Sequence, residues 1–183
     1  VTMVNSMTNP EIVLSVVKVL QEDTSNIKTI YVTDSCPPGA FTRLVFQHEN
    51  LARKIRKAGA VPLFLDEQKS VEIDFKGTIL RNAVPVPKIL YENLIKNRQE
   101  NTYINIPRLK THIMTGITVW LKNQYGILYD REKVYEHHRI NEKIVDLLRV
   151  FQPDFNIVDA TSVVDHGPIA IFDDWIKPLG LLL

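Results

Sequence analysis

The chain has 183 residues, of which 45% are hydrophobic, and this is enough to bury the core of one domain. Its 22 basic and 21 acidic residues give a formal net charge of +1, so it lacks the strongly basic character typical of nucleic-acid binding. A single cysteine excludes an internal disulfide framework, and no apolar run approaches the ~20 residues that span a bilayer, so we expect one cytoplasmic domain over residues 1–183 with no membrane partner.

Predicted helices and strands alternate along the chain. Thr8-Asn9-Pro10-Glu11 is typical of a helix start, since it offers a capping side chain, a proline in the first turn and an acid near the positive helix end. The further expected elements are, in order, a strand over Lys28–Thr33, a helix over Phe41–Ala58 that stops at Gly59, a strand over Val61–Leu65, short β-like pieces over Lys69–Pro87, a helix over Pro87–Asn97, a strand over Tyr103–Ile106, helices over Thr115–Asn123 and Ile140–Phe151, and a strand over Phe155–Asp159. Parallel neighbours need a crossover, so this spacing predicts an α/β fold: a Rossmann-like, mostly parallel sheet with helices on both faces.

Both ends of the chain look unusual. Val1 stands where an initiator methionine is expected, and the chain stops at Gly180–Leu183 as a new apolar strand begins. We therefore expect a fragment that is incomplete at its termini, which exposes apolar surface or pairs in a homo-oligomer.

Three predicted strands end in polar segments. These segments are Asp34-Ser35-Cys36, Lys110-Thr111-His112, and Asp159 running on to Asp165-His166-Gly167-Pro168. Parallel strands present their carboxyl ends at one edge of a sheet, so the three segments are expected to converge on one crevice.

The segment after Pro107 is the strongest candidate site. It is rich in cations, hydroxyls and amides, and no acidic residue occurs between Ile104 and Tyr129. The candidate ligand-binding residues are Lys110, Thr111, Thr115, Thr118, Lys122 and Asn123, with Asp34 and Asp159 from the neighbouring strands. They could form a cradle for a phosphate or a carboxylate, or they could be a solvated loop with ordinary capping threonines. Neither GxxxxGK[ST] nor GxGxxG occurs, so a standard nucleotide site is unsupported.

A metal site is a weaker alternative. Its ligands would come from His137, His138, Asp165 and His166, but no histidine pair has the helical spacing of zinc sites and there is no CxxC. Cys36 has no resolving partner, so it is better interpreted as a small buried hydrophobe than as a redox group.

PRLKTH…TGIT…LKNQYG resembles the signature of the domain-of-unknown-function 362 family, [IV]PKLKTH…TGVT…LKN…G. The resemblance extends to TNPEIVLSVVKVL, TIYVTDS and HHRINEKIVDLLRVFQPDFNIVDATSVVDHGP, and so covers nearly the whole chain. Arg108 stands where lysine is usual in the family. The resemblance implies site roles for Lys110, Thr111, His112, Thr118, Lys122 and Asn123, and weaker matches at His137 or His138, Asp159 and Pro168.

The family's name records that its activity is not established, and two functions stay open. The first is binding of a small anionic molecule, or an enzyme acting on one, with Lys110 and Lys122 holding the anion and His112 as general acid or base. The second is a non-catalytic redox-accessory or iron–sulfur-associated module whose cluster lies outside this chain. The resemblance implies it, since some family members carry a ferredoxin-like cysteine module that this one-cysteine chain lacks. The sequence requires no cofactor and names neither substrate nor reaction.

Overall fold

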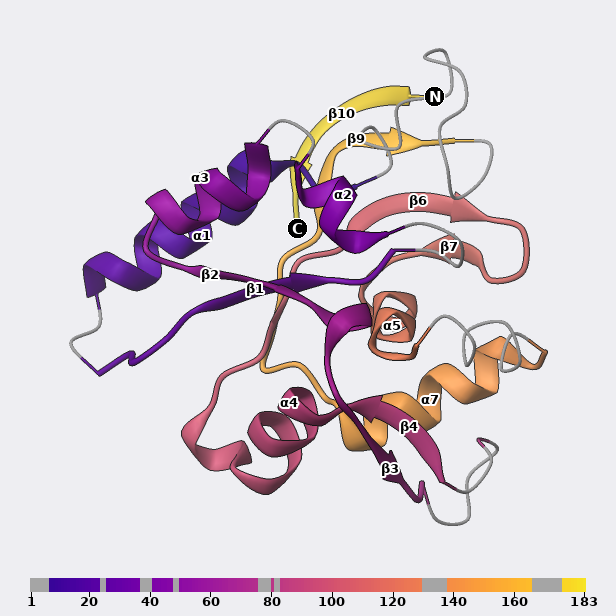
Figure 1. Cartoon of the computed structure of the whole chain (residues 1–183). Coiled ribbons are helices and arrows are strands. Elements are labelled where there is room, and N and C mark those ends of the chain that lie inside the picture. Colours follow the sequence, from indigo (N-terminus) through magenta and orange to yellow (C-terminus); the bar gives the residue numbers. More distant parts are fainter. Residues whose placement is uncertain are drawn as a thin grey trace.

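The structure is a computed structural model that describes residues 7–23, 26–36, 41–47, 50–75, 80, 83–129, 138–165 and 176–183. Its elements are, in chain order, α1 (Pro10–Asp23), β1 (Tyr31–Asp34), α2 (Thr42–Gln47), α3 (Leu51–Lys57), β2 (Val61–Phe64), η3 (Leu65–Glu67), β3 (Ser70–Ile73), β4 (Val84–Pro87), α4 (Lys88–Tyr91), η4 (Glu92–Lys96), η5 (Arg98–Glu100), β5 (Ile104–Asn105), β6 (Arg108–His112), β7 (Gly116–Thr118), α5 (Trp120–Asn123), η6 (Gln124–Ile127), α7 (Ile140–Val150), β8 (Phe155–Asn156), β9 (Asp159–Val164) and β10 (Ile176–Leu182). Helices and strands are mixed throughout, so the predicted α/β class is confirmed (Figure 1). None of the described helices is long and apolar enough to cross a membrane.

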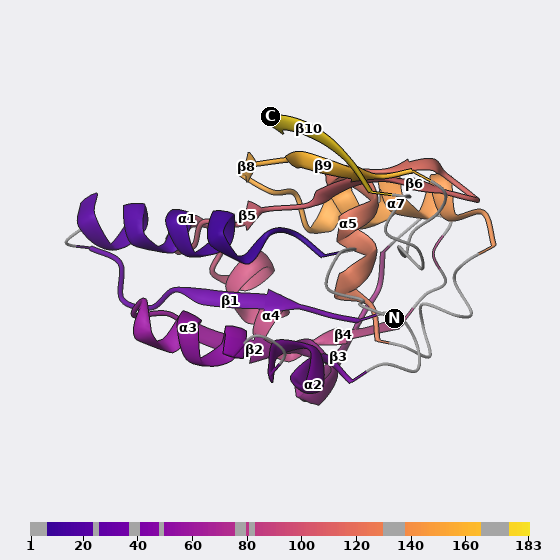
Figure 2. The same cartoon turned by 90° about the horizontal axis from the view of Figure 1, so that it is seen from above.

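The first parallel pair joins β1 to β2, in register from Tyr31 opposite Val61 to Asp34 opposite Phe64. Helices α2 and α3 lie in the crossover between these strands, and residues of α1 contact α3. Seen from above, α1 and α3 lie on either side of β1 (Figure 2). An apolar cluster that includes Val17 of α1, Ile55 of α3 and Phe64 of β2 holds this layer together. The parallel arrangement predicted for these two strands is confirmed.

The predicted single helix over residues 41–58 is wrong, because it divides into α2 and α3. Asn50 precedes α3 in the left-handed conformation, with φ 56°, and an asparagine tolerates this geometry better than most residues. Gly59 ends the segment as predicted, at φ +85°, where a side chain would be strained.

A parallel ribbon is formed by β5 and β6 on one side and β8 and β9 on the other. The amide of Asp159 donates to the carbonyl of Pro107 at 2.8 Å, so pairing continues past the proline. Proline lacks a donor, but its carbonyl still accepts. The predicted polar loop after Pro107 is therefore wrong: Lys110, Thr111 and His112 lie within β6.

The chain turns after His112 and returns as β7, antiparallel to β6, with Lys110 opposite Thr118 and His112 opposite Gly116. Gly116 has φ +73°, a conformation that favours glycine at this turn. The predicted helix over residues 115–123 is wrong in its first half, and α5 begins only at Trp120. All three residues between Gly116 and Trp120 are β-branched, and such residues favour extended backbone.

The four-stranded sheet has the order β10-β9-β6-β7, with β10 antiparallel to β9. Strand β10 lies at one edge of this sheet. The leucines at positions 179, 181, 182 and 183 are between 49% and 66% exposed.

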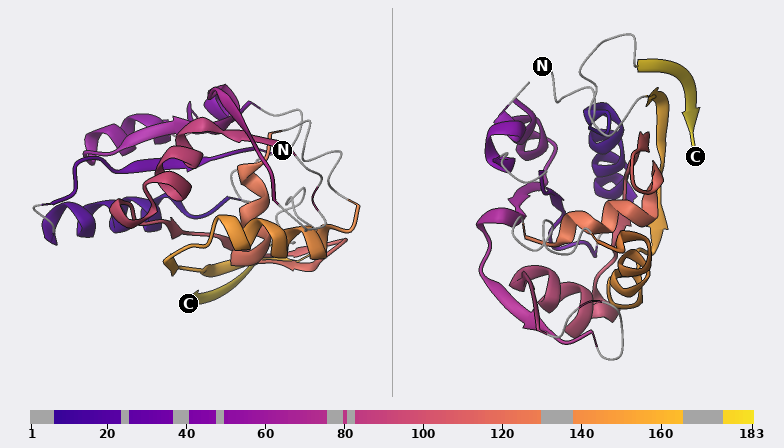
Figure 3. Two further views of the ribbon diagram at one scale, coloured as in Figure 1. Left: turned by 90° about the horizontal axis from the view of Figure 1, so that it is seen from below. Right: turned by 90° about the vertical axis from the view of Figure 1, so that its right-hand side faces the viewer.

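The larger apolar core lies between the β3–β4 hairpin and α7, where Val84, Val86, Leu147 and Phe151 are almost fully buried. Helix α7 confirms the helix predicted near residues 140–151. Figure 3 shows α7 beside the four-stranded sheet. A single Rossmann-like sheet is not confirmed, because the described strands pair as four small sheets, some parallel and some antiparallel.

Candidate functional site

The candidate site is built on one face of the β6–β7 hairpin. Side chains alternate between the two faces of a strand, so Arg108, Lys110 and His112 share a face of β6. Thr118 of β7 is the cross-strand neighbour of Lys110 and lies on the same face. We call these four residues the hairpin face.

Arg108 is the most deeply held cation of the hairpin face, with only 9% of its surface exposed. Its Nη1 donates to the carbonyl of Met7 at 2.8 Å, and its Nη2 donates to the hydroxyl of Ser162. Burial lowers the pKa of the guanidinium, whereas the nearby Asp159 carboxylate raises it. The Nε atom is buried and has no hydrogen-bond partner among the described residues.

Lys110 is partly buried beside Arg108. Burial lowers the pKa of its ammonium group, Asp34 raises it, and the charge of Arg108 lowers it again. Opposite Lys110, the Thr118 side chain is only 5% exposed, and its hydroxyl is buried without a hydrogen-bond partner in the described part of the chain. The hairpin face therefore combines a desolvated ammonium with two buried polar atoms, Nε of Arg108 and the hydroxyl of Thr118, that have no hydrogen-bond partner among the described residues.

Asp34 reaches this face from the end of β1. Its side chain is exposed, it accepts a 2.7 Å bond from the amide of Ser35, and its charge acts on Lys110. The predicted approach of this strand end to Lys110 is thereby supported. The third predicted segment is described only as far as Asp165, which is exposed; residues 166–168 lie outside the described residues.

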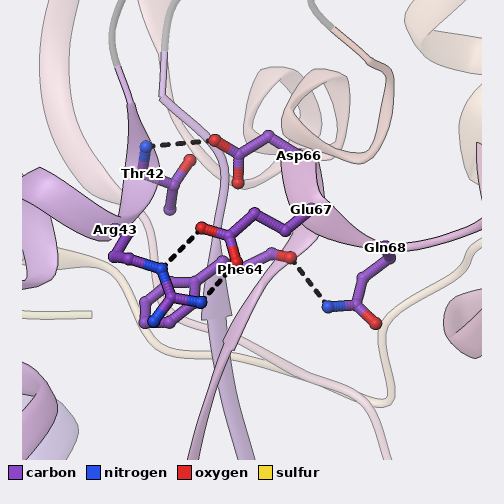
Figure 4. A network of polar contacts seen from close by, with 6 residues as sticks. All are labelled: Thr42, Arg43, Phe64, Asp66, Glu67 and Gln68. Carbon is purple, nitrogen blue, oxygen red and sulfur yellow. Dashed lines mark hydrogen bonds and ion pairs between the residues drawn. The ribbon is translucent and has the colours of Figure 1, made fainter.

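A polar network at the end of β2 positions the segment after Asp34. The Thr42 hydroxyl accepts a bond from the Cys36 amide at 3.2 Å, and the Thr42 amide donates to Asp66 at 3.1 Å. Figure 4 shows this second contact beside the paired side chains of Arg43 and Glu67. These bonds fasten α2 to the end of β2 and thus fix where β1 ends.

Two buried amides secure α5, which follows Thr118. Asn105 is 2% exposed; its Nδ2 donates to the carbonyl of Trp120 at 3.0 Å and its Oδ1 accepts from Asn123 at 2.7 Å. Gln124 is fully buried and accepts a 3.0 Å bond from the hydroxyl of Tyr103. Burial raises the pKa of Tyr103 to about 12, and Asp34 adds to this effect.

Several predicted ligand-binding side chains make bonds within the protein. Thr111 donates to the carbonyl of Val164 at 3.3 Å, and Thr115 donates to the carbonyl of Ile117 at 2.8 Å. Asn123 is exposed and donates to Asn105 as described, while Lys122 lies half-buried on α5. Thus the structure gathers Lys110, Thr118 and Asp34, whereas these threonines brace the strands.

His112 is 8% exposed, and its Nδ1 faces the amides of Met114 at 3.2 Å and Thr115 at 3.4 Å. As Nδ1 accepts these bonds, the proton of the neutral ring resides on Nε2. Proton transfer by His112 would therefore have to use Nε2.

Asp159 is fully buried and is engaged by the N-terminal segment. Its Oδ2 accepts from the amide of Asn9 at 2.7 Å, and its Oδ1 accepts from the amide and hydroxyl of Thr161 at 3.1 Å and 2.6 Å. The carboxylate thus holds the start of α1 and also acts electrostatically on Arg108.

The predicted metal alternative is only partly described. His137 and His166 lie outside the described residues, Asp165 is exposed, and His138 lies 3.3 Å (Nε2) from Nζ of Lys143. Within the described ranges, no group of three or more His, Cys, Asp or Glu side chains is arranged to hold a metal ion. The iron–sulfur alternative stays a prediction.

Sequence reasoning missed Arg108 as a site residue. The signal available was the family signature, in which lysine is usual at this position. Sequence reasoning also missed Tyr103, Asn105 and Gln124. A polar residue inside an otherwise apolar strand, as at Asn105, is the signal that could have been used.

The comparisons with known proteins agree with the resemblance in the sequence. The family model described as "Domain of unknown function (DUF362)" matches residues 3–178, which is nearly the whole chain. The comparisons with curated proteins and with solved structures returned no match.

Proposed function

The chain belongs to the DUF362 family, and from that premise we propose that it binds the anionic group, phosphate or carboxylate, of a small molecule at the hairpin face. One observation carries the proposal: Lys110 shares its face with two buried polar atoms, Nε of Arg108 and the hydroxyl of Thr118, that find no partner in the described structure. Buried polar groups are nearly always hydrogen-bonded, so such atoms point to a missing acceptor.

The electrostatics support an anion as that acceptor. An anion beside Lys110 would favour the charged form of the ammonium that burial disfavours. The charge of Arg108 also disfavours the charged form of Lys110, and an anion would offset their repulsion. We further propose Lys122, in the last turn of the adjoining α5, as a second cation, and Nε2 of His112 as the acid or base of any proton transfer.

Calorimetric titration with inorganic phosphate, acetate and malonate tests the proposal. Loss of one charge-assisted contact costs about 1.5–3 kcal/mol, so Lys110→Met is expected to weaken binding by about 10- to 150-fold. Lys57→Met is the matched control, because Lys57 is an exposed lysine on α3.

The wild-type protein should bind at least one of these anions, with Lys57→Met unchanged and Lys110→Met impaired. Absence of binding to all three anions would refute the proposal, as would equal affinity in both lysine variants. Lys122→Met tests the second cation separately.

A further inference from the structure

Lys110 lies at the centre of the hairpin face. Arg108 and His112 are each two residues away from it along β6, on the same side of the strand. Thr118 faces Lys110 across the hairpin. A primary amine therefore lies beside a permanent cation, an imidazole and a hydroxyl, and this grouping suits chemistry at Lys110 as well as binding.

The surroundings of Lys110 favour its neutral amine more than water does. Burial has the largest effect on the pKa of Lys110 and lowers it, and the charge of Arg108 also lowers it, against the opposing charge of Asp34. Only the neutral amine has the lone pair that attacks a carbonyl carbon. Enzymes obtain a nucleophilic lysine by removing it from water or by placing it next to another cation. Lys110 meets both conditions.

The neighbours of Lys110 match the remaining parts of an anionic carbonyl compound. Nε of Arg108 and the hydroxyl of Thr118 are buried without a hydrogen-bond partner among the described residues, and both can donate to an anionic group. Nδ1 of His112 accepts from the amide of Met114, so the proton of the neutral ring is on Nε2, where it can polarise a carbonyl oxygen. The hairpin face thus offers separate groups for the anion, for the carbonyl carbon and for the carbonyl oxygen.

We propose that Lys110 forms an imine with a small molecule that carries a ketone or an aldehyde near its anionic group, an inference that rests on the proposed function. The C–N bond forms as the carbonyl π electrons move to oxygen, which takes the proton that the nitrogen gives up. The hydroxyl then leaves as water with one proton from solvent, and the nitrogen lone pair completes the C=N bond. The product is a protonated imine, which retains the positive charge of Lys110 and still pairs with the anionic group.

Reductive trapping followed by peptide mass spectrometry tests this imine. Sodium cyanoborohydride reduces imines to stable amines and leaves ketones unreduced. The probes are pyruvate and dihydroxyacetone phosphate, which carry a ketone near a carboxylate and near a phosphate, and acetone is the neutral control. At least one probe should modify Lys110 about tenfold or more faster than the exposed Lys57, because a bound anion holds the ketone close to the amine. Lys57→Met should leave modification of Lys110 unchanged, and Lys110→Arg, which keeps a cation but no nucleophilic amine, should reduce total trapping to the level of the exposed lysines.

The outcomes separate the two proposals. If phosphate, acetate or malonate binds to the wild-type protein but neither probe modifies Lys110 faster than Lys57, the imine is refuted and the anion site stands. If acetone modifies Lys110 as fast as the probes do, the anionic group plays no part in the reaction and the inference is likewise wrong. If no anion binds and neither probe is trapped at Lys110, both proposals are wrong.

Discussion

Replacement of Tyr103 by phenylalanine should reveal a buried phenol that joins the segment before β5 to the start of η6. The hydroxyl donates to Oε1 of Gln124 at 3.0 Å, and Gln124 is fully buried. In Tyr103→Phe this oxygen loses its donor in the protein interior. A buried acceptor left unsatisfied costs about 1–3 kcal/mol, so we expect the free energy of unfolding at pH 7 to fall by that amount.

The difference should shrink as the pH rises. Burial raises the pKa of Tyr103 from 10.0 to about 12, so its stabilising contribution is complete below pH 10 and is lost as the pH rises towards 12. At one pH unit above 10 the loss is about 1.4 kcal/mol, and above pH 12 it approaches about 2.7 kcal/mol. Phenylalanine has no such titration.

Urea unfolding of both proteins at pH 7, 10 and 11 measures this change. Tyr31→Phe, which removes the hydroxyl of a tyrosine that is 46% exposed, controls for hydroxyl loss at pH 7 and should have little effect there. If the difference between the wild-type protein and Tyr103→Phe is the same at pH 7 and pH 11, Tyr103 does not titrate as a buried phenol and the reasoning fails.

Three further variants test the charges around the hairpin face. Lys110→Met should raise the free energy of unfolding at neutral pH, because burial lowers the pKa of Lys110 and so penalises its charged form in the folded protein. This gain in stability should shrink as the pH rises through the lowered pKa towards 10.5, and urea unfolding at several pH values measures it. Asp34→Asn removes a charge that raises the same pKa, so anion binding measured against pH should be lost at a lower pH than in the wild-type protein; an unchanged profile would contradict this. Asp159→Ala should lower the free energy of unfolding by about 3–5 kcal/mol, because it leaves the charge of the buried Arg108 uncompensated and the Asn9 amide without its acceptor. Denaturant unfolding measures this loss, and a value below about 1 kcal/mol would contradict a structural role for the Asp159 carboxylate.

The sequence predicted the parallel pairs well because local signals specify them. A run of β-branched residues ends near Asp34 and a short apolar run ends near Phe64, and a helix-length segment separates them, so a parallel crossover follows. The hairpin was harder to predict. Thr115–Asn123 contains enough helix-compatible residues to suggest one helix, and only tertiary pairing of Thr118 with Lys110 favours a strand.

The candidate site was predicted in part for the same reason. Lys110 and Thr118 were recognised as polar residues in a basic segment, and the structure places them opposite each other. The roles of Arg108 and Asp159 depend on partners about fifty to a hundred and fifty positions away along the chain. No local pattern reports such distances, so Asp159 was interpreted as a ligand-binding group although its oxygens hold Asn9 and Thr161.

The bond between Asn9 and Asp159 also constrains how the protein is made. The two residues lie 150 positions apart, and the Thr8 hydroxyl similarly depends on the carbonyl of Ile106. A ribosome adds roughly 5–20 residues per second, so the start of α1 waits roughly 8–30 seconds for the carboxylate that will receive it. During that time the Asn9 amide lacks the acceptor that it has in the finished fold. Among the described helices α1 is synthesised first and can pack against α3 early, yet its start gains the bond to Asp159 only after β9 has emerged.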